Sequence, residues 1–162
     1  MENYFLNDNQ SISDIPRSIQ NLFVKGNKGD MNNIIIINNY QNWKVIETGN
    51  KCFQHVREFV VDGLDCLESV KIGEESFWIS YEERDDGICR ITNCPNLRQL
   101  EIGDVSFDDF KSFKISNLNS IQSIKFGWYC FKYADFSLKG EWKEWMKERN
   151  VIWMKMKMKM MF

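Results

Sequence analysis

Hydrophobic residues recur along this chain at fixed distances from four glycines. Each glycine is followed four residues later by a phenylalanine, and in three of the four copies apolar side chains stand one, three and six residues before it. The pairs are Gly49/Phe53, Gly73/Phe77, Gly103/Phe107 and Gly127/Phe131, so the glycine intervals are 24, 30 and 24 residues. A period in the twenties is typical of proteins in which each repeat forms one coil of a solenoid.

Two apolar clusters within each repeat alternate with polar residues at period 2. In the second repeat the first cluster contains Phe59 and Val61, and the second contains Val70 and Ile72. This alternation predicts two short strands in each coil, each with a buried face. The sequence therefore predicts a β-rich solenoid of stacked parallel strands, with about four 24-residue repeats and a cap at each end.

The corners of the coil are predicted from residues with special backbone freedom. The repeated glycine permits a positive φ, so we expect it to turn the chain away from the strand. The phenylalanine four residues later is expected to fold back between the two sheets. A second corner is predicted ten residues before each glycine, where residue types that tolerate a left-handed backbone recur. These residues are Asn39, Gly63, Asn93 and Asn117.

Three segments resemble the L-x-x-L-x-L core of leucine-rich repeats. They are LESVKIG (67–73), LRQLEIG (97–103) and IQSIKFG (121–127), with glycine near the place where that family often has asparagine. The cysteine or serine before each repeated phenylalanine makes the copies similar to BspA-like leucine-rich repeats. The resemblance covers roughly residues 35–140, and it implies a right-handed coil with a rigid curved surface for protein partners.

Three regions are predicted from where the repeat pattern starts and stops. Residues 1–34 form an N-terminal tail and cap, residues 35–140 form the solenoid, and residues 141–162 form a C-terminal cap and a low-complexity Met/Lys tail. Within the first region we expect residues 1–10 to be loose. The alternating methionines and lysines of the tail could form an edge strand, touch a membrane surface, or be a low-complexity remnant.

Composition is that of a single soluble domain. The chain has 162 residues, of which 43% are hydrophobic and 27% charged, and its net charge is -2. These values exclude a disordered chain and a strongly nucleic-acid-binding one. The start of the chain lacks a basic and an apolar leader segment, and the longest apolar run is Ile34 to Ile37. We therefore predict a cytoplasmic monomer without a membrane span, and we expect neither membrane contact nor nucleic acid as a partner.

Cysteine and histidine give little support for catalysis or metal binding. Cys89 and Cys94 align with apolar residues of neighbouring repeats, so we interpret them as core side chains. The number of cysteines, five, is odd, which disfavours a disulfide framework. The single histidine, His55, lies in a variable stretch and is interpreted as a solvated loop residue. Hydrolase, nucleotide-binding and metalloprotease motifs do not occur, so we predict no enzyme activity, no cofactor and no metal site.

An insertion separates the second repeat from the third. The 30-residue interval exceeds the 24-residue one by six residues, and the excess falls between Ile79 and Gly87. Insertions leave a solenoid as loops on one face, which is often a binding face. Tyr81 and Arg84 would project there beside four carboxylates that lack the spacing of a calcium-binding loop. A tolerated surface insertion without a partner is the alternative interpretation.

The second strand of each coil offers another candidate surface. The residues two before each glycine form a row of alternating charge, consisting of Glu47, Lys71, Glu101 and Lys125. An adjacent polar row includes Ser69 and Gln99. Cross-strand pairs of this kind contribute only about 0.2 to 1 kcal/mol each, so the row could serve register and solubility rather than recognition.

The function expected from these features is a non-catalytic protein–protein interaction module. Its partner-binding residues are predicted on the strand face and on the inserted loop, and they are Lys71, Glu101, Lys125, Ser69, Gln99, Tyr81 and Arg84. Two alternatives stay open. The first is a relative of surface adhesins or receptor ectodomains, and the second is a structural repeat protein without a dedicated partner.

Overall fold

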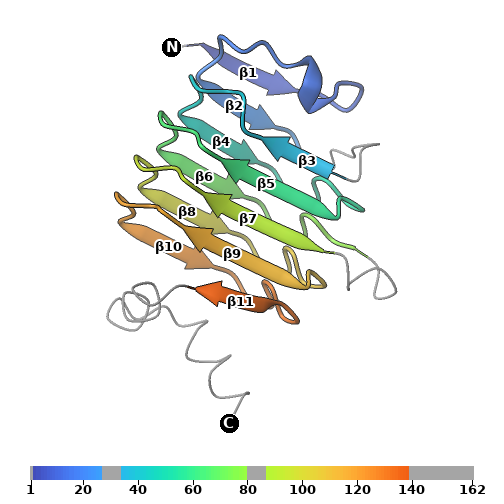
Figure 1. Ribbon diagram of the computed structural model, residues 1–162. Coiled ribbons are helices and arrows are strands. Elements are labelled where there is room, and N and C mark those ends of the chain that lie inside the picture. Colours follow the sequence, from blue (N-terminus) through green and yellow to red (C-terminus); the bar gives the residue numbers. More distant parts are fainter. Residues whose placement is uncertain (1, 27–33, 80–86, 139–162) are drawn as a thin grey trace.

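The chain folds into two all-parallel β-sheets that face each other (Figure 1). The computed structural model describes residues 2–26, 34–79 and 87–138. Sheet A has the strand order β1 (Asn3–Leu6), β2 (Asn21–Val24), β4 (Val45–Thr48), β6 (Ser69–Ile72), β8 (Gln99–Ile102) and β10 (Ser123–Phe126). Sheet B has the order β3 (Ile34–Ile37), β5 (Glu58–Asp62), β7 (Ile88–Thr92), β9 (Ser112–Ser116) and β11 (Asp135–Leu138). The one helical element of the described residues is the 3-10 helix η1 (Ile12–Asp14).

Strand register follows the repeat spacing read from the sequence. In sheet A, Val45 lies beside Ser69, Ser69 beside Gln99, and Gln99 beside Ser123, which gives offsets of 24, 30 and 24 residues. Beyond β2, strands of the two sheets alternate along the chain, and Figure 1 shows them pointing in opposite directions. The prediction of two short strands in each repeat is confirmed, and the arrangement is compatible with a β-solenoid.

A stack of phenylalanine rings occupies the space between the sheets. Phe77 and Phe107 are stacked with ring centroids 4.5 Å apart, and Phe107 and Phe131 are 4.9 Å apart. Phe53 extends the stack at 5.2 Å from Phe77. All four rings are buried, and Phe59 of β5 packs against Phe77 and Phe107. The expected placement of the repeated phenylalanines is confirmed.

The repeated glycines have a different role from the predicted one. The backbone has a positive φ at each repeated phenylalanine and two residues before it, and not at the glycine. At the glycine, neighbouring backbones come close together. A Cβ added to Gly49 would lie 2.6 Å from the nitrogen of Gly26, and one added to Gly103 would lie 2.7 Å from the nitrogen of Glu74. Glycine is therefore needed because the coils touch there.

The residue before each phenylalanine bonds to this close-packed corner. Ser106 Oγ donates a hydrogen bond of 2.7 Å to the carbonyl of Gly73, and Cys130 Sγ donates one of 2.8 Å to the carbonyl of Gly103. The hydroxyl of Ser106 also accepts from the backbone N–H of Ser76. The restriction of this position to cysteine and serine is explained by the need for a small buried donor.

The predicted left-handed backbone at the second corner is present in three of the four repeats. Gly63, Asn93 and Asn117 have positive φ values of 69°, 54° and 55°, whereas Asn39 does not. The asparagines also form a ladder, because Asn117 Nδ2 donates to Asn93 Oδ1 and Asn93 Nδ2 donates to Asp62 Oδ1, at 2.6 and 2.8 Å. Asparagine tolerates the left-handed backbone and links neighbouring coils through its side chain.

The N-terminal prediction needs a correction. Residues 1–10 were expected to be loose, but β1 pairs in parallel with β2 from Asn3 to Leu6. Leu6 is buried, and Asn21 Nδ2 donates a 2.7 Å hydrogen bond to Asn3 Oδ1. The first strand therefore extends sheet A and covers its apolar end. The predicted C-terminal cap and tail, 141–162, lie outside the described residues.

Replacing Phe107 with alanine should destabilise the fold strongly, because Phe107 packs against four other phenylalanine rings. We expect a loss of about 3 to 5 kcal/mol in the free energy of unfolding, against under about 1 kcal/mol for Lys71→Ala on the outer face of sheet A. Urea denaturation of both variants measures the difference. Equal losses would contradict the assignment of Phe107 to the core.

Two glycine substitutions distinguish the two reasons why a position can require glycine, namely close contact with a neighbouring backbone and a positive φ. Gly103→Ala should cost about 3 kcal/mol, because its Cβ would collide with the backbone of the preceding coil. Gly63→Asn should cost less than about 1 kcal/mol, since open space surrounds the added Cβ and asparagine tolerates a positive φ. Thermal and urea unfolding would report the ranking, and a more harmful Gly63→Asn would show that conformation dominates.

Candidate protein-binding face

The outer face of sheet A brings the predicted strand residues together. On β6, Ser69 is half-buried and Lys71 exposed, while Val70 and Ile72 point into the core. The other strands repeat this alternation, because parallel pairing in register keeps equivalent side chains on one face. Two rows result. The outer charged row consists of Glu47, Lys71, Glu101 and Lys125, and the polar row consists of Val45, Ser69, Gln99 and Ser123.

The charges of this row are not joined to each other by ion pairs in the part of the chain that the structure describes. The described ion pairs lie elsewhere, between Glu58 and Arg90 at 2.8 Å on sheet B and between Lys51 and Glu75 at 3.5 Å on a turn. Register in sheet A is maintained by backbone hydrogen bonds and by the apolar rows beneath the surface. Of the four charged side chains, Lys71 and Lys125 are exposed, and Glu47 and Glu101 are half-buried.

Two aromatic residues extend the same row, and the sequence analysis missed them. Phe5 and Phe23 pair in register on β1 and β2, and Phe23 in turn lies beside Glu47 of β4. Their rings stack with centroids 5.3 Å apart, and Phe5 remains 56% exposed. The signal was the pair of apolar residues Leu22 and Val24, which places the intervening Phe23 on the outer face of the strand. The repeat alignment did not extend this pattern back to β1. Aromatic side chains, phenylalanine included, are enriched in protein–protein interfaces.

The other predicted site residues cannot be placed on this face. Tyr81 and Arg84 lie outside the described residues. The flanking positions are described, and both belong to the packed structure, since Ile79 is fully buried and Gly87 lies against Phe110. These two flanking residues lie between β6 and β7.

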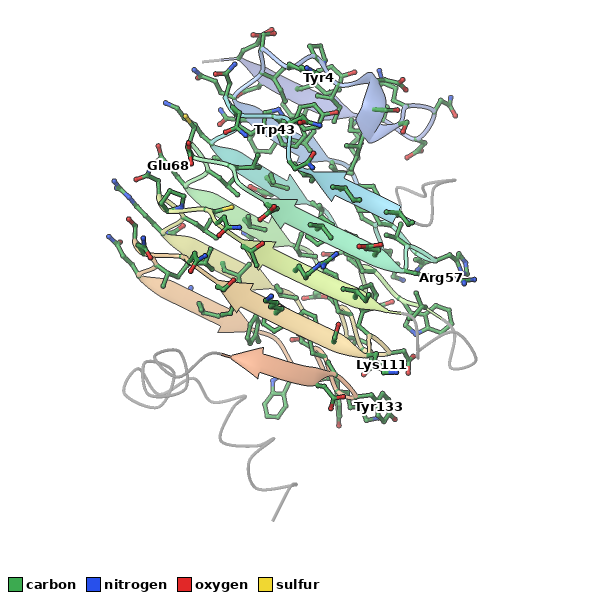
Figure 2. The ribbon with its side chains drawn as sticks, viewed as in Figure 1. Tyr4, Trp43, Arg57, Glu68, Lys111 and Tyr133 are labelled. Carbon is green, nitrogen blue, oxygen red and sulfur yellow. The ribbon has the colours of Figure 1, made fainter. Side chains whose placement is uncertain are left out.

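A second group of exposed aromatic residues occupies the last described turn. Trp128 and Tyr129 are 58% and 57% exposed, and Lys132 Nζ lies 4.8 Å from the ring centroid of Tyr133. In Figure 2, Tyr133 and Lys111 lie at one edge of the stacked coils, and Glu68 lies at the opposite edge. The last turn is therefore an edge feature, separate from the rows on sheet A.

Four of the five described cysteines are buried, and the histidine lies on the surface. Burial raises the pKa of Cys130 to about 12 and that of Cys89 well above its usual value, so both stay protonated at neutral pH. The interpretation of Cys89 and Cys94 as core residues is confirmed by their full burial. His55 is exposed on a turn, as expected, with its ring edge-on to Trp78 at 6.4 Å.

One carboxyl group on a turn is unfavourably placed. Asp108 Oδ1 is buried and has no hydrogen-bond partner in the described structure. Desolvation raises the pKa of this carboxyl, the neighbouring carboxylate of Asp109 raises it further, and Lys132 opposes the shift. Ionisation of Asp108 therefore costs folding stability.

No protein-family model matches this chain, and neither a curated protein nor a solved structure matches it. In the described residues, no helix is long and apolar enough to cross a membrane. The repeat pattern and the two parallel sheets are compatible with a repeat solenoid.

Asp108→Asn should stabilise the protein at neutral pH. Because the folded-state pKa of Asp108 lies above its unfolded value, near 3.8, the destabilisation is fully present at neutral pH and disappears as the pH falls below that value. The melting temperature of the variant should exceed that of the wild type near pH 7, and the gap should close toward about pH 3. A gap that does not depend on pH would contradict the role of ionisation.

Proposed function

We propose that this chain is a leucine-rich-repeat-like, right-handed solenoid of about four coils, and that it acts as a non-catalytic protein-binding module. The binding surface is the outer face of sheet A, with Lys71, Glu101, Lys125, Ser69 and Gln99 as contact residues. The observation that carries the proposal is the row of alternating charges, which is set in register on rigid strands and has no ion pairs of its own.

Physical arguments favour recognition over a purely structural role for this row. A site on paired strands is held more rigidly than a site on a loop, so less side-chain and backbone entropy is lost on binding. Fixed charges of alternating sign favour one partner and repel others whose charges are out of phase. Phe5 and Phe23 add apolar contact area at one end of the row.

A three-residue charge-reversal variant tests the proposal. Lys71→Glu, Glu101→Lys and Lys125→Glu together should abolish capture of the specific partner from native lysate, because three of the four charged contacts in the row become repulsive. The readout is affinity capture followed by quantitative mass spectrometry. Circular dichroism and thermal unfolding establish that the variant remains folded, as expected for surface charges.

A matched control reverses three charges outside this face. Lys111→Glu, Lys114→Glu and Asp65→Lys change the net charge by the same amount, and all three side chains are exposed. Lys111 immediately precedes strand β9 of sheet B, Lys114 lies on β9, and Asp65 follows β5 of the same sheet. The control should retain the partner. A partner that survives reversal on sheet A, or that is lost equally in the control, would overturn the proposal.

A further inference from the structure

The outer row of sheet A has a fixed and measurable spacing. Six side chains lie in register across six neighbouring strands, in the order Phe5, Phe23, Glu47, Lys71, Glu101 and Lys125. Neighbouring strands in a sheet lie about 4.8 Å apart, so the four charges span about 14 Å and the whole row about 24 Å. A partner must present complementary groups at that spacing.

An extended peptide does not meet this requirement. Side chains on one face of a strand are separated by about 6.7 Å, so four of them span about 20 Å, against about 14 Å for the four charges of the row. The third and fourth side chains of the peptide therefore lie too far along the row to face their charges. A helix does meet it. With a rise of 1.5 Å per residue, positions i, i+3, i+7 and i+10 span about 15 Å, and i to i+17 spans about 25 Å.

The width of the face agrees with a helix as well. The polar row and the charged row stand two residues apart on each strand, and the exposed residues that precede the strands, such as Glu68 and Arg98, border them. This strip is about 10 Å wide along the strands, which is close to the 10 to 12 Å diameter of a helix with its side chains.

We infer that the partner of this face is an α-helix that lies across the strands of sheet A. Its contacting stripe carries two apolar residues, at i and i+3, for Phe5 and Phe23. Basic residues at i+7 and i+14 face Glu47 and Glu101, and acidic residues at i+10 and i+17 face Lys71 and Lys125. The inference rests on the proposed function, because it assigns the partner's chemistry at the same face.

Synthetic helical peptides test the inference directly. One peptide carries the stripe described above on an alanine-rich helix, and a second has the basic and acidic stripe positions exchanged, with the same composition. Fluorescence anisotropy should show the first peptide binding the wild-type protein at least about tenfold more tightly than the second. Phe5→Ala should weaken both peptides to the same extent, since its contact carries no charge.

A protein variant with the row reversed provides the matched control. Glu47→Lys, Lys71→Glu, Glu101→Lys and Lys125→Glu together leave the net charge unchanged and turn the row into its complement. This variant should prefer the exchanged peptide. A preference that stays with the first peptide, or an absence of preference in either protein, would overturn the inference.

A third peptide separates helix recognition from recognition of charge alone. It carries the same apolar, basic and acidic residues at every second position of a proline-containing segment that cannot form a helix. Equal or tighter binding of this peptide would refute a helical partner. If no peptide binds while capture from lysate still depends on Lys71, Glu101 and Lys125, the helix inference fails and the proposed function stands. If capture does not depend on those residues, the proposed function fails.

Discussion

Contact between neighbouring backbones at the repeated glycines is the constraint on which the other features of this fold depend. The positions where Cβ atoms of Gly49 and Gly103 would stand are already occupied by backbone atoms of the preceding coil. Because this corner has no room for a side chain, the main chains of neighbouring coils touch there, which adds to the backbone hydrogen bonds that maintain strand register. The Ser and Cys donors then bond to glycine carbonyls of the preceding coil.

The phenylalanine stack compensates for the backbone conformation that this corner requires. A left-handed backbone costs a residue other than glycine roughly 1 to 2 kcal/mol, and all four repeats share two such residues in this turn, with His55 as a third in the first repeat. One of the two is the phenylalanine, whose ring is fully buried between the sheets. Burial of a phenylalanine side chain stabilises by roughly 1.5 to 3 kcal/mol, which is enough to offset the strain at its own backbone. The turn and the core are therefore formed by the same residue.

The repeat alignment predicted most of the architecture because each apolar position recurs. The strands, their parallel register and the burial of Phe77, Phe107 and Cys89 follow from periodicity alone. The role of the glycine could not be predicted, because both a positive φ and a close approach select the same residue type. The strand β1 was missed because it lies only 18 residues before β2, from Asn3 to Asn21, outside the 24-residue period. Phe5 was missed from the site for the same reason, whereas Phe23 lies 24 residues before Glu47, within the period, and was missed because the charged row was read only from Glu47 onward.

In-register stacking fixes the order and the spacing of the charges on the outer face of sheet A. Each coil contributes one charged residue at the same position along its strand in sheet A. Because neighbouring strands pair in parallel and in register, the order of these charges in the sequence is also their order across the sheet. On a loop, backbone freedom would leave the distances between the charges variable. On this sheet the spacing between charges is fixed by backbone hydrogen bonds, and only a ligand with nearly the same repeat distance can satisfy several of them together.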